Sequence, residues 1–475
     1  MLDRDSVTRL LPGVVEALDA RFDETLAELV EFARIPGVSA DGYDPAEVVR
    51  SAEHVAGLLA AAGLEDVELL RVGDAHPAAV GSWRGAGDAP TVLLYAHHDV
   101  QPPGRESHWD SPPFEPTLRP DGRLYGRGVV DDKAGLLLHL AALRAWREVA
   151  GELPVNVVLL VEGEEEIGSV HLAEFLRAHS ERLQADVIVL SDTANLATGV
   201  PSLTVTLRGL VSVDVTVRAL DHPVHSGLWG GPTPDAATAL CSLLGRLTDE
   251  TGAIAIPGFY DAVPELDPAT REAFASLPFD AATFREDVGL LAGVPLSGEP
   301  NRSVYEQLWS RPALAVTALE AMLISESANQ LIAEARARVG LRIPPGMDPE
   351  IASAILVEFL ESAPPRGVVV ETEVESCASG WKTEPIGPAF DAARRALSAG
   401  FGRDSVVIGC GGTIPFVGPF SEVLGGAPAL LLGLEDPICN AHGENESLHL
   451  GDFRKAAHAS AHLLAELARL PKGDC

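Results

Sequence analysis

Two histidines and an aspartate follow an apolar stretch of the chain, and all three residue types are common metal ligands. Residues 91–96 are mostly apolar and predict a short buried strand, at whose end His97, His98 and Asp99 stand. Because side chains alternate along a strand, His97 and Asp99 share one face. A metal-bound imidazole usually donates its second N–H to a carboxylate, so we favour His97 over His98 as a ligand. A polar strand end with hydrogen-bonded histidines is the alternative that this stretch leaves open.

A pair of aspartates stands directly before a predicted helix. Asp131 and Asp132 precede the apolar run 134–149, and Gly126 and Gly128 allow a tight backbone path before them. An aspartate that caps a helix is common at such a position. This segment alone therefore leaves two interpretations open, a capping residue or a carboxylate ligand supplied by Asp131 or Asp132.

A cluster of glutamates follows a second predicted strand. Residues 155–161 form an unbroken apolar run, which is typical of a parallel strand covered on both faces. Like charges that are packed at the end of a buried strand raise each other's pKa unless a cation is present. The carboxylates that follow the run are Glu162, Glu164, Glu165 and Glu166.

Three predicted strands therefore end in groups that could bind a metal. These groups are His97, Glu165 or Glu166, and Asp192, which follows a third apolar run over 185–190. Strands alternate with helices in this part of the chain, which predicts an α/β layer. Sites in such sheets form outside the carboxyl ends of the strands. The sequence predicts a metal site at that edge.

The middle of the chain has a different pattern. Apolar and polar residues alternate over about 202–217, which predicts antiparallel strands and a new domain, whereas residues 251–311 show no strong periodicity. After Trp381 helices and strands alternate again. We predict an α/β catalytic domain with a mixed sheet, formed by residues 1–206 and 383–475, with an inserted α+β domain of residues 207–382.

The composition limits the classes of partner. A chain of 475 residues is too long for one ordinary core, and 46% hydrophobic residues indicate a globular protein. The net charge of −34 argues against nucleic acid and anionic membranes as partners. Salt adaptation and coding bias both explain this acidity.

The cysteines and the N-terminal residues bear on the compartment. The five cysteines are widely spaced and include no Cys-x-x-Cys, so neither a disulfide framework nor a cysteine zinc site is indicated. The first residues lack the basic start and apolar core of a signal peptide. We therefore expect a cytoplasmic protein.

Six segments, taken in order, resemble the dinuclear zinc hydrolases that include carnosine dipeptidases, carboxypeptidase G and aminoacylase. The likeness extends from about Val30 to the C-terminus, and it is closest to the dipeptidase branch. The resemblance implies a zinc-peptidase catalytic domain and an inserted lid and dimerisation domain. The six segments are residues 96–102, 126–133, 162–169, 190–192, 224–231 and 441–446.

The resemblance also implies a metal centre with two divalent ions per chain. Zinc is the expected metal, with manganese and cobalt as alternatives. His97 and Asp192 would bind one ion, Glu166 and His442 the other, and Asp131 would bridge the two.

The catalytic roles implied by the resemblance agree with general chemistry. Glu165 would accept a proton from a metal-activated water and pass it to the leaving amine. Asp99 would support His97, and the peptide bond between Asp131 and Asp132 would be cis.

Four residues of the second half would contact substrate by the same resemblance. His225 would be a lid histidine, Arg342 would bind the substrate carboxylate, and Gly412 and Thr413 would hold the substrate. Taken alone, His225 could be an exposed residue and Arg342 part of an ordinary ion pair. Cys410 stands where carnosine dipeptidases have a glutamate, which leaves the exact substrate open.

These inferences together predict a metallodipeptidase that cleaves small peptides. We expect a homodimer formed through residues 207–382, so that His225 reaches the active site of the partner subunit. An amidohydrolase that removes the acyl group of an N-acyl amino acid is the first alternative. A metal-bound interaction protein without catalysis is the second, against which the complete ligand set and Glu165 argue.

Overall fold

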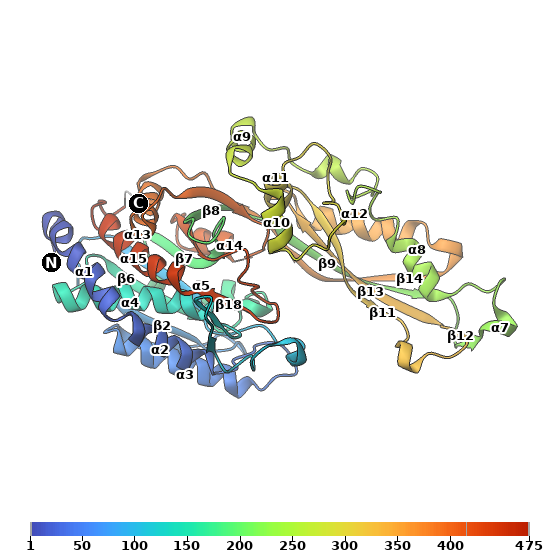
Figure 1. Ribbon diagram of the computed structural model, residues 1–475, viewed down its shortest axis with the longest axis horizontal. Helices are drawn as coiled ribbons and strands as arrows, with labels where there is room; N and C mark the ends of the chain where they lie inside the picture. Colours follow the sequence, from blue (N-terminus) through green and yellow to red (C-terminus); the bar gives the residue numbers. More distant parts are fainter. Residues whose placement is uncertain (1, 415, 474–475) are drawn as a thin grey trace. The chain divides into compact units, whose positions relative to one another are not determined.

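The computed structural model describes residues 2–414 and 416–473, which form two compact units. The first unit consists of three segments: the residues up to Val205, Glu384–Ile408, and the described residues from Phe416 onward. The second unit comprises Thr206–Thr383 and a short segment that begins at Gly409. The elements of each unit are labelled in Figure 1.

Four parallel strands lie at the centre of the large mixed sheet. The described strands of this sheet follow the order β1-β2-β6-β3-β7-β17-β8-β15, with β16 on β8. β6, β3, β7 and β17 are parallel to their neighbours in this series, and β2 and β8 flank them antiparallel. The strand bounds are β1 Glu65–Leu70, β2 Ala78–Trp83, β3 Thr91–His97, β6 Asn156–Glu162, β7 Val187–Ala194, β8 Ser202–Leu207, β15 Trp381–Lys382, β16 Val406–Cys410 and β17 Ala429–Glu435.

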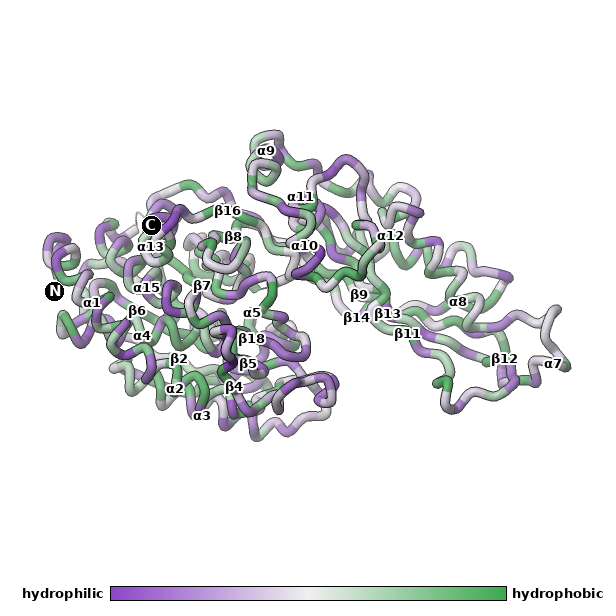
Figure 2. Tube along the Cα trace, in the orientation of Figure 1, coloured by the Kyte–Doolittle hydropathy of each residue, from purple (hydrophilic) through white to green (hydrophobic). Residues whose placement is uncertain are grey.

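Helices bury the apolar residues of these strands. Every residue of β3 and β6 is buried, and the apolar residues of β6 and β7 are seen as green segments in Figure 2. α4 packs against β3, α1, α2 and α15, while α13 packs along α15. The helix bounds are α1 Arg4–Ala20, α2 Phe22–Ala33, α3 Pro45–Ala61, α4 Lys133–Ala150, α13 Pro388–Phe401 and α15 Leu450–Leu467.

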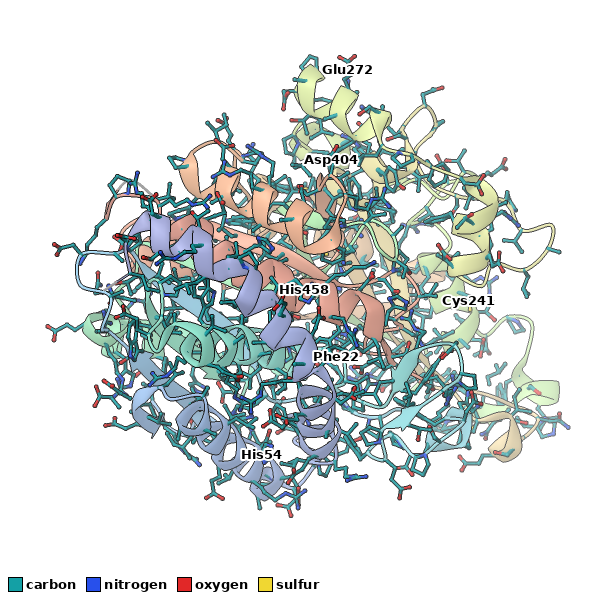
Figure 3. The ribbon with its side chains drawn as sticks, turned by 60° about the vertical axis from the view of Figure 1, so that its left-hand side comes forward. Phe22, His54, Cys241, Glu272, Asp404 and His458 are labelled. Atoms are coloured by element: carbon teal, nitrogen blue, oxygen red, sulfur yellow. The ribbon has the colours of Figure 1, made fainter. Side chains whose placement is uncertain are left out.

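The first two helices meet at Arg21, where periodicity alone favours one helix over residues 14–33. Arg21 has φ −103° and ψ 5°, which is outside the helical region. Its side chain forms ion pairs with Glu24 and Glu148, which fix the turn. Phe22, which is labelled in Figure 3, then packs on Phe453. The ring centroids are 5.8 Å apart. The amphipathic pattern continues through the turn because both helices pack against α4.

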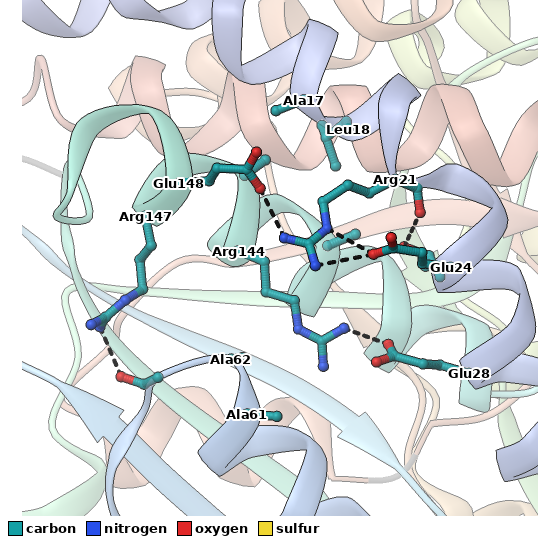
Figure 4. Close-up of a pocket in the computed structure, with 14 residues that line it drawn as sticks. Ala17, Leu18, Arg21, Glu24, Glu28, Ala61, Ala62, Arg144, Arg147 and Glu148 are labelled. Atoms are coloured by element: carbon teal, nitrogen blue, oxygen red, sulfur yellow. Dashed lines mark hydrogen bonds and ion pairs between the residues drawn. The ribbon is translucent and has the colours of Figure 1, made fainter.

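A cavity of about 540 Å³ lies among α1, α2, α3 and α4 (Figure 4). Its arginines already have partners: Arg21 pairs with Glu24 and Glu148, and Arg144 pairs with Glu28. Arg147 donates a hydrogen bond to the carbonyl oxygen of Gly63 at 2.8 Å. The cavity is lined by helices and contains none of the residues at the strand ends.

The second unit is built on a four-stranded antiparallel sheet in the order β11-β13-β9-β14. Alternate residues of β9 are buried, and α8 and α12 pack on this sheet. Their contact forms a separate apolar core. The bounds are β9 Gly209–Arg218, β11 Ala313–Glu320, β13 Glu334–Ile343, β14 Val369–Ala378, α8 Ala236–Leu244 and α12 Pro349–Ser362.

Three short helices occupy the stretch that shows no strong periodicity. They are α9 Pro268–Ser276, α10 Ala281–Asp287 and α11 Val304–Ser310. Helices of seven to nine residues are too short to display a clear apolar period. Their N-caps, Asp267, Asp280 and Ser303, each accept a backbone hydrogen bond, and these residue types are the signal that identifies them.

None of the helices in the described parts of the chain is long and apolar enough to cross a membrane.

Candidate metal centre

His97 ends β3 and faces a group of carboxylates. Its Nδ1 lies 3.1 Å from the backbone oxygen of Asp99, which can only accept, so Nδ1 carries a proton. Nε2 donates to Asp131 Oδ1 at 3.0 Å and lies 3.9 Å from Asp192 Oδ1, and a metal ion bound there would take the place of the Nε2 proton. His98 points elsewhere and donates from Nε2 to the oxygen of Pro77 at 2.8 Å. Burial lowers the pKa of His98 to about 4, so it is neutral at pH 7.

Asp99 connects His97 to the turn that follows β6. Its carboxylate accepts hydrogen bonds from the backbone N–H groups of Glu165 and Glu166, at 3.2 and 3.1 Å. Ser39 Oγ donates a third bond at 2.6 Å. Burial alone would raise the pKa of Asp99, but the bonds from His97 and Ser39 lower it below its ordinary value. Asp99 is therefore a buried anion that fixes both neighbouring segments.

Asp131 lies between the two histidines of the site. Its Oδ1 faces His97, and its Oδ2 is 2.9 Å from Nε2 of His442. The peptide bond between Asp131 and Asp132 is cis. Asp132 occupies the N-cap position of α4 without a side-chain cap bond, and its Oδ2 accepts from the backbone N–H of His97 at 3.3 Å. The capping interpretation does not describe either aspartate.

The adjacent residues Glu165 and Glu166 have different surroundings. Glu166 Oε2 lies 3.2 Å from Nε2 of His442 and accepts from Gln101 Nε2 at 2.9 Å. Burial raises the pKa of Glu165 well above its usual range, and the charges of Asp192, Glu166 and Asp131 add to this effect. Glu165 is thus a carboxylate with a strong affinity for a proton.

A further carboxylate, Glu435, also belongs to this group. It is the last residue of β17, which runs parallel to β7. Ligand atoms of Glu435, Asp131 and Asp192 lie within 4.8 Å of one another. The sequence reading missed it because the apolar run over 429–432 predicts a strand that ends too early. Extending that strand to the same sheet edge would have found it.

The predicted substrate residues all belong to the second unit. Arg342 in β13 donates to Oγ1 of Thr413 at 2.6 Å, so the structure brings these two together. The N–H of Gly412 donates to Sγ of Cys410 at 3.3 Å. His225 lies elsewhere in the unit, in β10 (Val224–His225), where it is exposed and its Nδ1 accepts from the N–H of Gly227.

Residues 93–466 match the sequence model of a family described as peptidase family M20/M25/M40. The chain belongs to this family. It is 35% identical to the cysteinylglycine-S-conjugate dipeptidase of Corynebacterium striatum over 81% of this chain and 83% of that protein. It is 30% identical to the Cys-Gly metallodipeptidase dug1 of Schizosaccharomyces pombe over 96% and 98% of the two chains.

The solved structures agree with this assignment. Human carnosine dipeptidase 1 superposes with a TM-score of 0.88 at 26% identity, covering 97% of this chain and 99% of that one. The resemblance to the dipeptidase branch and the α/β fold with a mixed sheet are therefore confirmed. As a member of the M20 family, the protein is a peptidase.

The donor set of this M20 peptidase fits a divalent metal. Carboxylates predominate, and burial raises the pKa of several of them, that of Glu435 to about 8. The partial desolvation of His442 opposes its protonation, but Asp131 and Glu166 raise its pKa to about 11. The site thus strongly favours positive charge, and imidazole with carboxylate oxygen is a donor set that zinc accepts. Ligand atoms of His97, Asp131 and Glu166, and of His97, Asp132 and Asp192, also form compact groups.

Proposed function

We propose that this M20 peptidase hydrolyses the amide bond of dipeptides with two divalent metal ions per chain. The observation that carries the proposal is the convergence of two histidines and several buried carboxylates at one edge of the sheet in the first unit. The dipeptidase names of its relatives support the same substrate class.

In this proposal five residues hold the metals. His97 and Asp192 form one site, and Glu166 and His442 form the other. The two oxygens of Asp131 face different histidines, at 3.0 and 2.9 Å, which supports a bridging role. Zinc is the proposed metal, with manganese and cobalt as alternatives. When bound, the ions would polarise the amide carbonyl and lower the pKa of a water.

Glu165 is the proposed general base. Burial and the neighbouring carboxylates raise its pKa, which favours the acceptance of a proton from water and its later donation to the leaving amine. Asp99 fixes the backbone of Glu165 and accepts from the ring of His97, so it positions both groups. Because the two adjacent glutamates have different partners, they can have different roles: Glu165 transfers the proton and Glu166 binds the metal.

Arg342 and Thr413 are proposed to bind the substrate carboxylate, with Gly412 beside them. A guanidinium and a hydroxyl at hydrogen-bond distance form a suitable donor pair for a carboxylate. Cys410, which accepts the N–H of Gly412 in the same loop, leaves the exact substrate open, and an N-acyl-amino-acid amidohydrolase is the alternative. The metal chemistry is the same for both substrate classes.

A homodimer formed through residues 207–382 is proposed as the active assembly. Within the described residues, β11 pairs with β13 on one side only, and the apolar side chains of Val316, Leu319 and Ile324 on or after it are exposed. Open strand edges of this kind favour association. His225 would then reach the active site of the partner subunit. A monomer that is fully active at micromolar concentration would contradict this assembly.

A cytoplasmic location is also part of the proposal.

A substrate panel tests the proposed function. Metal-free protein is loaded with zinc, manganese or cobalt, and turnover of dipeptides is compared with turnover of N-acyl amino acids. We expect metal-dependent release of free amino acids from dipeptides. Hydrolysis restricted to N-acyl amino acids would favour the alternative, and no turnover with two bound ions would leave only a metal-binding protein.

A further inference from the structure

Arg127 and Glu446 form a buried ion pair beside the metal centre. Arg127 Nη1 lies 2.7 Å from Glu446 Oε2, and the side chains are 1% and 0% exposed. A buried ion pair gains little stability over an apolar pair, because both charges must be desolvated. The remaining bonds of the two side chains therefore indicate what the pair does.

The guanidinium of Arg127 binds two segments that carry or hold ligands. Its Nη2 donates to the backbone oxygens of His442 and Gly443, at 3.0 and 3.1 Å. The same nitrogen donates to the oxygen of Pro102 at 3.1 Å. Pro102 follows Gln101, whose amide donates to Glu166. One side chain thus connects the segments that determine the positions of His442 and Glu166.

The carboxylate of Glu446 binds the third segment. It accepts from the backbone N–H groups of Gly128 and Val130, at 3.1 Å each, and from that of Asp131 at 3.4 Å. The backbone oxygen of Glu446 also accepts from the N–H of Gly126 at 3.0 Å. The ion pair therefore joins the loop of Asp131 to the loop of His442.

The loop of His442 needs such support. Asn440, His442 and Asn445 all have positive φ, of 54°, 63° and 62°, a conformation that L-residues rarely adopt without constraint. The side chain of His442 is 58% exposed, so packing does not hold its ring. The bonds from Arg127 to the carbonyls of His442 and Gly443 act on this strained backbone directly.

We propose that Arg127 and Glu446 are a positioning pair for one of the two metal sites, the one formed by Glu166, His442 and the bridging Asp131: the pair joins the loops of His442 and Asp131 to the segment that carries Gln101, which bonds to Glu166. The proposal rests on the two-metal centre of the proposed function. His97 and Asp192 lie in strands and depend much less on the pair. Loss of the pair selectively weakens the second ion.

Zinc binding to the full-length protein tests this role. Arg127→Lys keeps a positive charge but lacks the planar fork that reaches several carbonyls, and Glu446→Gln keeps the size but removes the charge. Zinc stoichiometry is measured by equilibrium dialysis against a series of free zinc concentrations. We expect two ions in the wild type. In each variant the second ion should bind 10–100-fold more weakly, with a clearly smaller loss of affinity for the first ion, which shares only Asp131 with it.

Arg123→Lys is the matched control. Arg123 forms a buried bidentate pair with Asp436 and bonds to Ser447, and neither partner is a proposed metal ligand. We expect a comparable loss of thermal stability with two ions still bound at wild-type affinity. If Arg127→Lys does not fold, Glu446→Gln carries the same test.

Several results would overturn the proposal. One is an equal loss of affinity for both ions in the variants, and another is wild-type zinc binding in Arg127→Lys and Glu446→Gln. The others are an equal loss of zinc affinity in Arg123→Lys, or a single bound ion in the wild type. Dipeptide turnover of the wild type is measured separately. Two bound ions without turnover would refute the proposed function but not the positioning role of Arg127 and Glu446. Turnover with unaltered zinc binding in the variants would refute only the positioning role.

Discussion

The two halves of the metal centre are built differently. His97, Asp192 and Glu435 lie in parallel strands, whose positions are fixed by the hydrogen bonds of the sheet. Asp131 and His442 lie in loops, which side chains from other segments hold. Equally close ligands therefore depend on different interactions: the ligands of the first half depend on the sheet, and those of the second half on a few buried polar contacts.

Removing the residue shared by both halves should have the largest effect. In Asp131→Ala the bridging carboxylate is lost, and the remaining buried charges no longer have a common ligand between the two ions. We expect both ions to bind much more weakly and dipeptide turnover to fall below detection. Metal content by mass spectrometry and turnover measure this, and normal uptake of two ions would disprove the bridging role.

Removing a ligand of the loop half alone should have a smaller effect. Glu166→Gln replaces an anionic ligand by a neutral one, so the second ion should bind more weakly while the first remains. Excess metal should restore part of the activity. Zinc titration of turnover checks this, and a defect that no metal concentration relieves would argue that Glu166 is not a ligand.

Removing a side chain that supports the loop half should have a smaller effect again on the affinity for the second ion. Gln101→Met removes the bonds from the amide to Glu166 Oε2 and to its backbone oxygen. A hydrogen bond to a charged group contributes about 1.5–3 kcal/mol, so we expect roughly tenfold or greater loss of affinity for one ion.

Tyr95→Phe is the control in the strand half. It removes a buried bond of 2.6 Å from Tyr95 to Glu162, but β3 still holds His97 through the sheet. Zinc affinity should stay within twofold of the wild type. An equal loss of zinc affinity in Tyr95→Phe and Gln101→Met would contradict the distinction between the two halves of the metal centre.

The smallest expected effect is on the pH dependence of stability. Burial raises the pKa of Glu162 and of Glu435 to about 8, from ordinary values of 4.5. The folded metal-free protein therefore keeps protons that the unfolded chain has released, so its stability should fall as the pH rises from about 5 to 8. Zinc should offset this fall, since it favours the ionised carboxylates.

Thermal unfolding at several pH values measures this effect. We expect the Tm of metal-free protein to fall by a few degrees over this range, with a flatter profile in Glu435→Gln. A Tm that rises with pH in the metal-free protein would contradict the assigned direction.

The sequence predicts the strand half of the centre better than the loop half. Alternation along β3 predicts that His97 and His98 face opposite ways, and the structure has His97 toward carboxylates and His98 toward Pro77. An unbroken apolar run predicts each central strand, because both faces of such a strand are buried. This pattern fails for Glu435, where the apolar run stops before the strand does.

The loop half depends on contacts that no local pattern contains. Arg127 and Glu446 are 319 residues apart in sequence, and only the folded chain shows that they pair. The end of α1 at Arg21 is likewise fixed by Glu148, which lies far along the chain. Long-range pairing of polar groups is therefore the part of the site that sequence reading misses.

The most direct test of the account is a comparison of Glu165→Gln with the wild type, with kcat on a cleaved dipeptide and metal content measured on the same samples. The variant keeps the size and polarity of the side chain but cannot accept a proton. We predict two bound ions, a nearly unchanged KM and a kcat lower by about 10²–10⁴-fold. A near-native kcat, or a defect that excess metal relieves, would contradict the assignment of Glu165 as the base of a two-metal peptidase.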